Sequence, residues 1–106
     1  MKFVLGVCAC ALIAGAAHAQ QFPNKPVRLI VGFVPGGGTD LAARFVATAL
    51  SELWGTTVIV DNRAGAGGAV ATELTVRAAP DGYTVTLCTI AHAITAARVK
   101  QPYDSI

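Results

Sequence analysis

A run of three glycines directly after an apolar segment is the feature that most constrains the fold of this chain. Residues 27–34 are apolar except for Arg28, and Pro35 and three glycines at 36–38 follow them. An unbroken apolar run is typical of a parallel strand that is covered on both faces. Proline cannot donate to a strand ladder, and consecutive glycines let the backbone approach a neighbouring group closely. We therefore expect a buried strand that ends in a tight loop.

The residues after the glycines predict a helix over 41–54. Thr39 or Asp40 can cap its start, and Gly55 is suited to the left-handed residue that ends a helix. The first turn of such a helix leaves its backbone N–H groups without partners inside the helix, at the positive end of the helix dipole. An anion at the end of the strand is the expected ligand.

Apolar side chains recur at helical spacing in this segment, and we expect that stripe to face the core. Its members are Ala42, Phe45, Val46, Ala49, Leu50 and Leu53. Packing is also the role that we expect for the other large aromatic side chains, Trp54 and Tyr83.

The order of strand, loop and helix then repeats. We predict further strands at 57–60 and 84–88, and further helices from Gly68 or Ala69 to 79 and at 93–99. Because crossovers between parallel strands are right-handed, the fold class is α/β with a three-stranded parallel sheet, flanking helices and strand order 2-1-3. All three strand-to-helix loops then meet at one edge of the sheet, where open α/β sheets bind ligands.

The first 19 of the 106 residues have the pattern of an export signal. Lys2 is a short positive region, residues 3–14 are apolar, and the segment 17–19 (Ala-His-Ala) matches a cleavage site. The exported chain would begin at Gln20. A membrane or core helix, or a lipoprotein signal, is the alternative interpretation, and the apolar stretch is short for a membrane anchor.

Composition excludes several classes of function for the exported chain. With Lys2 removed, seven basic and six acidic residues remain, so neither nucleic acid nor an anionic membrane surface is an expected partner. Cys88 would be the remaining cysteine, which excludes an internal disulfide and a cysteine metal set. We expect no metal and no cofactor.

The glycine loops do not match nucleotide-binding motifs. Position 41 is Leu, so the spacing G-x-G-x-x-G is absent after the first strand, and no lysine follows as in a P-loop. A turn without a ligand is the other alternative, although consecutive glycines cost backbone entropy. In the second loop, the amides of Gly67 and Gly68 are the favoured ligand contacts.

Side chains around the second and third loops leave alternatives open. Asn62 can contact a ligand or brace the loop, and bracing is favoured. Arg63 can bind an anion or pair with Asp61. Thr89 can contact a ligand or cap a helix. His92 is expected to be structural, because the sequence offers no nucleophile and base around it, and we predict no catalytic residue.

Motifs distributed along the chain resemble one protein family. They are Phe22-Pro23-x-Lys25-Pro26-Val27-Arg28-Leu29-Ile30-Val31-x-Phe33-x-Pro35-Gly36-Gly37-x-Thr39-Asp40, Ala43-Arg44, Leu50-Ser51-x-x-Trp54-Gly55, Val58-x-Val60-x-Asn62-Arg63-x-Gly65-Ala66-Gly67-Gly68, Ala78-Ala79-Pro80-Asp81-Gly82-Tyr83-Thr84, Thr89, His92-Ala93-Ile94 and Pro102-Tyr103-Asp104. Together they resemble the tripartite tricarboxylate transporter receptors, the Bug-type extracytoplasmic solute-binding proteins.

The resemblance implies a periplasmic, two-lobed, flytrap-like α/β protein that is not an enzyme. Such a receptor traps a small organic carboxylate between its lobes and delivers it to the membrane permease subunits of the transporter. The implied ligand contacts, through backbone amides and bridging water, are Pro35, Gly36, Gly37, Gly38, Thr39, Asp40, Gly65, Ala66, Gly67, Gly68 and Thr89.

The chain departs from the family pattern in three places and in length. Gly32 replaces a frequent proline, Cys88 replaces a common glycine, and the segment 92–102 is about one residue shorter. Because family members are much longer, we expect residues 20–106 to form an incomplete first lobe that binds ligand weakly or not at all alone. A truncated, non-functional product or the remnant of an exported α/β enzyme domain is the alternative.

Overall fold

The computed structural model describes residues 21–103, so the predicted export signal at 1–19 lies outside the described residues. The elements in chain order are β1 (Val27–Val31), α2 (Gly38–Trp54), β2 (Val58–Asn62), the short 3₁₀ turn η1 (Ala66–Gly68), α3 (Ala69–Arg77), β3 (Thr84–Leu87) and α4 (Ile90–Arg98). None of the helices in this part of the chain is long and apolar enough to cross a membrane.

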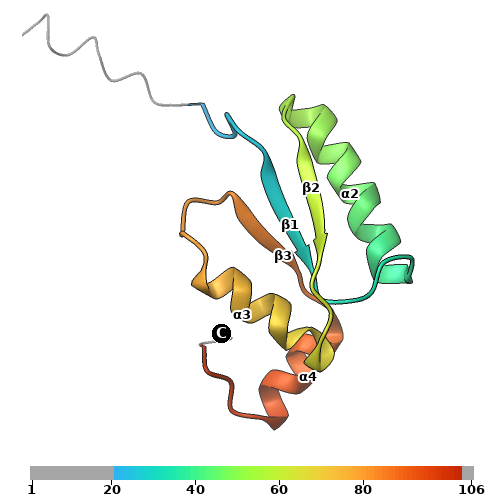
Figure 1. Cartoon of the computed structure of the whole chain (residues 1–106), viewed down its shortest axis with the longest axis vertical. Helices are drawn as coiled ribbons and strands as arrows, with labels where there is room; N and C mark the ends of the chain where they lie inside the picture. Colours follow the sequence, from blue (N-terminus) through green and yellow to red (C-terminus); the bar gives the residue numbers. More distant parts are fainter. Residues whose placement is uncertain (1–20, 104–106) are drawn as a thin grey trace, which may run out of the picture.

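The three described strands form one parallel sheet in the order β2-β1-β3 (Figure 1). The most apolar strand, β1, is in the centre, and it is buried at four of its five positions. This confirms the predicted fold class and strand order. The cause is the one inferred from the sequence: a strand between two neighbours and under helices on both faces loses nearly all contact with water.

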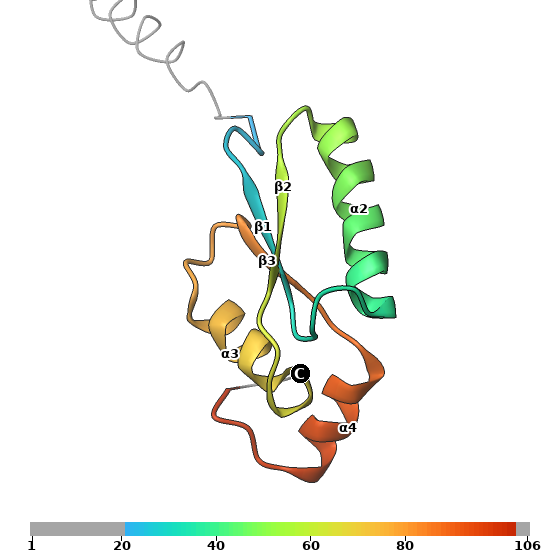
Figure 2. The same ribbon diagram turned by 45° about the vertical axis from the view of Figure 1, so that its right-hand side comes forward.

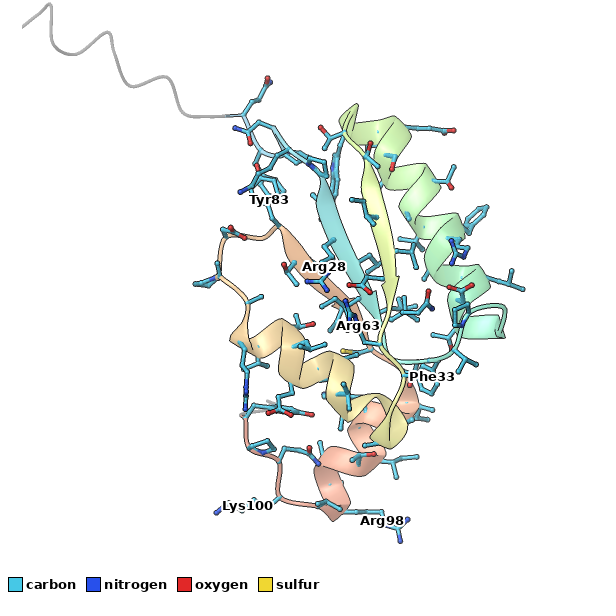
Figure 3. The ribbon with its side chains drawn as sticks, in the orientation of Figure 1. Arg28, Phe33, Arg63, Tyr83, Arg98 and Lys100 are labelled. Atoms are coloured by element: carbon cyan, nitrogen blue, oxygen red, sulfur yellow. The ribbon has the colours of Figure 1, made fainter. Side chains whose placement is uncertain are left out.

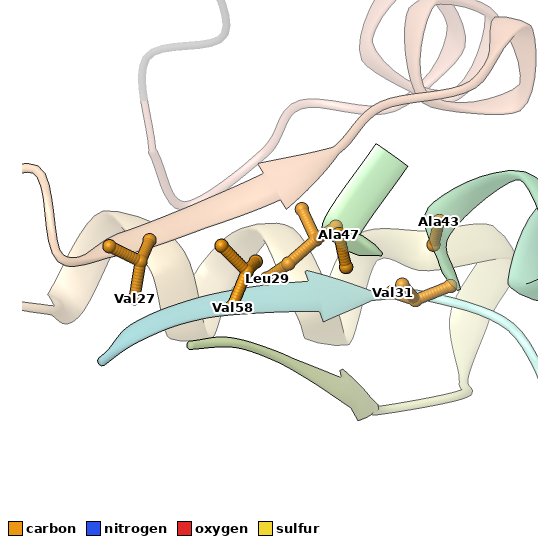
Figure 4. Packing of buried hydrophobic residues seen from close by; sticks show 6 residues of the cluster. All are labelled: Val27, Leu29, Val31, Ala43, Ala47 and Val58. Carbon is orange, nitrogen blue, oxygen red and sulfur yellow. The ribbon is translucent and has the colours of Figure 1, made fainter. Parts of the chain in front are cut away.

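The main core lies between the sheet and α2. Val27, Leu29 and Val31 alternate toward this face and contact Ala43 and Ala47 of α2. Figure 4 shows these side chains together with Val58 of β2. The helix presents alanines at its closest approach, so its backbone lies near the strands.

The predicted inner face of α2 is wrong. Phe45 is 79% exposed and Leu53 is 77% exposed, and the buried residues of the helix are Asp40, Ala43 and Ala47. Of the predicted stripe, Leu50 packs against the core, whereas Ala42, Phe45, Val46, Ala49 and Leu53 are exposed. The helix has two apolar faces, and the one with the smaller side chains packs on the sheet. The packing role predicted for Phe45 is therefore also wrong.

The other face of the sheet is covered in part by α3. Figure 2 shows α2 and α3 on different sides of the strands, with α4 beyond the strand ends. Ile30, which alternation points away from the main core, is 0% exposed, and Ala71 of α3 is 1% exposed. α3 lies next to both β1 and β3.

A small aromatic cluster closes the end of the sheet where the strands begin. The Phe22 ring contacts those of Trp54 and Tyr83, with centroid distances of 6.1 and 5.0 Å. The Tyr83 hydroxyl accepts a hydrogen bond from Asn24 N at 3.0 Å and donates one to Asn24 Oδ1 at 2.8 Å. Lys25 Nζ lies 4.4 Å from the Tyr83 ring centroid. The cluster fixes residues 22–25 and agrees with the packing predicted for Trp54 and Tyr83.

Several element boundaries differ from the predicted ones. β1 ends at Val31 and not at residue 34, and α2 begins at Gly38, three residues before the predicted start. α4 likewise begins at Ile90 and not at residue 93. The C-terminal stop of α2 is as predicted, because Gly55 has a φ of 64° and donates its N–H to Ser51 O.

Candidate functional site

The three loops that follow the strands start from the same level of the sheet. Val31, the last residue of β1, is in register with Asn62, the last of β2, and with Leu87, the last of β3. In Figure 1 the arrowheads of all three strands point toward η1 and α4. The predicted common edge is therefore confirmed. We call the loops 32–37, 63–68 and 88–89 the first, second and third loop.

The Asp40 carboxylate organises the first loop from inside the protein. The residue is 2% exposed, and its Oδ2 accepts hydrogen bonds from Gly36 N and from Arg44 Nε, each at 2.9 Å. The N-cap position of α2 is Gly37, so the carboxylate reaches back from the first turn to the loop. The predicted N-cap, Thr39 or Asp40, is therefore wrong, because both residues lie inside the helix and the N-cap makes no side-chain capping bond.

Asp40 is held in its ionised form. The hydrogen bond from Arg44 lowers the pKa of the carboxyl from 3.8 to about 2, with further contributions from Gly36 N–H and the Asn62 amide. The same carboxylate is close to the helix N-terminus, where negative charge is favoured. Because both of its oxygens accept hydrogen bonds in this network, the side chain is occupied in holding the loop.

Asn62 connects the first and second loops. Its Nδ2 donates to Phe33 O at 3.1 Å and to Asp40 Oδ1 at 2.9 Å. Both acceptors belong to the segment after β1, whereas Asn62 ends β2. The bracing role that the sequence favoured for Asn62 is confirmed by these contacts.

The backbone amides of the first loop differ in availability. Pro35 has no N–H, and Gly36 N is bonded to Asp40. The hydrogen-bond ladder of α2 begins with Leu41 N, which donates to Gly37 O at 3.0 Å. The amides of residues 38–40 precede that donor and have no acceptor within the helix ladder. They are the donors that this loop can offer to an anion.

The second loop is a tight turn with backbone angles that favour glycine. Gly65, Gly67 and Gly68 have φ values of 146°, 63° and 93°, and Ala66 has a φ of 48°. Gly68 N donates to Gly65 O at 3.0 Å, so this favoured amide is already engaged inside the turn. Gly67 is exposed, and its amide is the favoured donor that remains at this loop.

The first and second loops approach each other at Gly32. A Cβ atom added there would lie 2.7 Å from Gly68 Cα and 3.3 Å from Ala71 Cβ, which is too close for a side chain. Gly32, a departure from the family pattern, therefore permits the present spacing of the two loops.

Arg63 forms an ion pair next to the second loop. Its Nε lies 2.9 Å from Asp61 Oδ1, and Arg28 binds the other carboxylate oxygen. Figure 3 shows the two arginines together beside the strands. Partial burial opposes ionisation of Asp61, but the hydrogen bonds from Arg28 and Arg63 prevail and lower its pKa. Of the two alternatives for Arg63, the structure thus contains the pair with Asp61.

The third loop places Thr89 at the start of α4. Thr89 is the N-cap residue, but its side chain makes no capping hydrogen bond. It lines a small pocket with a free volume of about 10 Å³, about the space of one water molecule. Residues of all three loops and of α3, β3 and α4 line this pocket. They are Gly32, Phe33, Gly67, Gly68, Ala71, Thr72, Thr86, Leu87, Cys88, Thr89 and His92. A larger ligand would lie on the edge above this pocket.

Two further features of the described chain lie apart from this edge or concern metal binding. A wider, shallow depression lies between α2 and β2, away from the glycine loops, and Arg44, Ser51 and Val60 are among the residues that line it. Within residues 21–103, no group of three His, Cys, Asp or Glu side chains is arranged to hold a metal ion.

No role in the site was predicted for Arg44, which belongs to one of the motifs quoted above, or for Thr72. The spacing of four residues between Asp40 and Arg44 is the signal that could have identified Arg44. Thr72 offers no comparable signal, because its role depends on how α3 and α4 pack.

The comparisons with known proteins agree on one family. Residues 42–106 match the family model described as "Tripartite tricarboxylate transporter family receptor". Protein BugT of Bordetella pertussis is 46% identical over 85 residues, which cover 79% of this chain and 26% of that protein. The chain spans about a quarter of the length of the curated relatives that it matches.

Solved structures give the same result for the fold. MatC of Rhodopseudomonas palustris with bound malate superposes with a TM-score of 0.70 at 34% identity, over 77% of this chain and 29% of that one. R. palustris Rpa4515 with adipate gives a TM-score of 0.66 at 38% identity, over 68% of this chain and 24% of that one. The sheet described above therefore corresponds to part of these longer proteins.

Proposed function

Because the chain belongs to the tripartite tricarboxylate transporter receptor family, we propose that it forms the carboxylate-binding edge of an extracytoplasmic solute-binding receptor. The proposed ligand is a small organic acid with one of its carboxylates on this edge. The remaining length of such a receptor would cover the ligand from the other side. The proposal includes a binding role without catalysis, periplasmic location after removal of residues 1–19, and delivery of the ligand to membrane permease subunits.

One observation carries the proposal: three strand ends lie in register, and free backbone donors follow two of them. The amides of residues 38–40 are outside the ladder of α2, and the Gly67 amide belongs to the exposed second loop, which starts from the same level of the sheet. Backbone donors at a helix N-terminus favour an anion over a neutral ligand. The Asp40 and Asp61 carboxylates are each paired with arginine, so their negative charges are balanced and do not oppose an anionic ligand.

The relatives support an organic acid over an inorganic anion. MatC is described with malate and Rpa4515 with adipate, which are both small dicarboxylates. Within the edge, we propose three parts as the contact set: residues 35–40, which span the end of the first loop and the first turn of α2; the second-loop residues 65–68; and Thr89. In this set Asp40 holds the loop, and the amides of residues 38–40 and Gly67 bind the ligand, together with a water molecule in the small pocket.

Calorimetric titration of the chain with malate and adipate tests this proposal. Because the chain forms an incomplete lobe, we expect only weak heat of binding with both acids, and none with the corresponding diamides, which have the same length without charge. Equal binding of acids and diamides, or binding of a neutral sugar alone, would contradict the anion site.

A matched pair of variants at Gly38 tests the backbone donors themselves. Gly38 is the first residue of α2, a position where proline is tolerated, and it follows Gly37 in an extended conformation with ψ of 171°. Gly38→Pro removes one N–H and should weaken carboxylate binding about tenfold, which corresponds to about 1.4 kcal/mol. Gly38→Ala keeps the N–H, and its Cβ meets nothing within 4 Å, so its affinity should remain unchanged.

A further inference from the structure

His92 lies at the centre of a short hydrogen-bonded chain that the proposed ligand contacts do not include. Its Nδ1 is 3.2 Å from Thr72 Oγ1, and the Thr72 hydroxyl donates to Gly68 O at 3.1 Å. Thr72 is 9% exposed, so this arrangement is largely shielded from water. The chain therefore connects α4, which follows the third loop, with the turn that forms the second loop.

The direction of the bonds follows from counting protons. A threonine hydroxyl has a single proton, which can go either to Gly68 O or to His92 Nδ1. Both contacts are hydrogen bonds at once only when Gly68 O accepts that proton and His92 Nδ1 carries a proton of its own. In that arrangement neutral His92 is the Nδ1–H tautomer. The protonated ring also carries this proton, so the contact is compatible with both charge states.

Two further contacts involve His92. The Tyr103 ring stacks on its ring, with a centroid distance of 6.4 Å and an angle of 8° between the ring planes. The His92 backbone N–H donates to Thr89 O at 3.0 Å and holds the residue in the first turn of α4. Tilting the imidazole out of its plane would break the stacking contact with Tyr103.

The second loop needs such a support because its own conformation is unusual. Ala66, Gly67 and Gly68 all have positive φ values, which are uncommon outside glycine. α4 packs against η1, and Thr95 Oγ1 would be 3.7 Å from a Cβ atom placed on Gly67. The direction of the Gly67 amide therefore depends on how firmly α4 and α3 hold this turn.

We propose that His92 is a positioning residue that fixes the second loop, by donating from Nδ1 to Thr72 while Thr72 donates to Gly68 O. The effect on ligand binding rests on the proposed function, because it assumes that the Gly67 amide binds a carboxylate. The hydrogen-bond chain itself does not depend on that assumption. This assigns a role to the first turn of α4 that differs from direct ligand contact.

Nuclear magnetic resonance of the neutral His92 ring tests the hydrogen-bond chain without a ligand. Long-range proton–nitrogen correlations identify which ring nitrogen carries the proton, and we expect Nδ1. Thr72→Val should shift the population toward the Nε2–H tautomer. Thr75→Val is the matched control, because Thr75 donates to Ala71 O one turn along α3 and has no histidine contact among the described residues. A ring that is mainly Nε2–H in the unaltered protein would overturn the proposal.

Substitutions of His92 test its positioning effect. In His92→Asn the amide nitrogen can take the place of Nδ1, whereas in His92→Gln it reaches toward the place of Nε2. Malate affinity should fall about fivefold in His92→Ala and in His92→Gln, the equivalent of one hydrogen bond of about 1 kcal/mol. His92→Asn should stay within about twofold of the unaltered protein.

The readouts separate failure of this inference from failure of the proposed function. If the unaltered chain binds the diamides as well as the acids, the proposed function fails. The tautomer of His92 in the unaltered protein and the Gly67 amide resonance in the His92 variants then still decide the positioning role. The positioning role would be overturned if the unaltered protein has an Nδ1–H ring but all three His92 variants keep its malate affinity and its Gly67 resonance. If His92→Ala does not fold, the Thr72 and Thr75 pair decides the question.

Discussion

At the scale of single residues, Asp40 combines burial with three donors, and this has a consequence for the pH dependence of folding. The depressed pKa means that the folded protein releases the Asp40 proton more readily than the unfolded chain does. The stabilisation is therefore complete above the ordinary value of 3.8 and is lost as the pH falls toward about 2.

Denaturant unfolding at a series of pH values measures this loss. The free energy of unfolding should decrease between pH 3.8 and about 2, and Asp40→Asn should be less stable at neutral pH and show a flatter dependence in that range. Glu52→Gln is the control, since Glu52 is an exposed acid on the same helix. Equal pH profiles for the unaltered protein and Asp40→Asn would contradict the network around Asp40.

At Gly32, one added carbon atom is expected to change both the stability of the fold and the position of the second loop. Gly32→Ala places a Cβ 2.7 Å from the Gly68 backbone, so the second loop must move. We expect a loss of about 1–3 kcal/mol in the free energy of unfolding, typical of overpacking, with shifted amide resonances at Gly67 and Gly68. Gly38→Ala, which meets open space, should be neutral or slightly stabilising. Unshifted loop resonances in Gly32→Ala would be evidence against close contact of the two loops.

At the scale of elements, α2 shows that side-chain size and burial are not equivalent. Because Ala43 is 0% exposed against β1, Ala43→Leu should cost about 1–3 kcal/mol of unfolding free energy. Phe45 is 79% exposed, so Phe45→Ala should change stability by about 0.5 kcal/mol or less. Urea unfolding of both variants measures this contrast, and a larger loss for Phe45→Ala would mean that the stripe faces the core after all.

The same helix explains where reasoning from the sequence fails. Helical spacing predicted the element and its C-terminal glycine, but α2 has two apolar faces, and periodicity alone cannot select the one that packs. The large residues Phe45 and Leu53 suggested the wrong face. Ala43 and Ala47 pack on the sheet instead, and their small side chains let the helix lie close to the strands.

The strands were more predictable than the contacts at their ends. The apolar run of β1 and the right-handed crossover rule fixed a parallel sheet with order β2-β1-β3 and a common edge for the loops. The engagement of Gly68 N inside its own turn, and the contact between His92 and Thr72, depend on positive φ values and on helix packing, which sequence patterns do not encode.

At the scale of the whole molecule, burial is concentrated in the central strand. Val27, Ile30 and Val31 are at most 1% exposed, whereas Ile59 of β2 and Val85 of β3 are 49% and 38% exposed. Amide hydrogen exchange should therefore be slowest in β1 and faster in the two outer strands of the described sheet, because outer strands open without disrupting the core. Equal protection of all three strands would indicate that β2 and β3 are covered in solution.

The aromatic cluster around Phe22 and Tyr83 determines where a probe can be attached. It anchors residues 22–25 at the end of the sheet where the strands begin, and the glycine loops lie at the far end. A fluorophore or biotin linked just upstream of Phe22 would thus leave the loops facing outward. A sensor surface built in this way would present every copy in the same orientation, with its anion-accepting end toward the flowing sample.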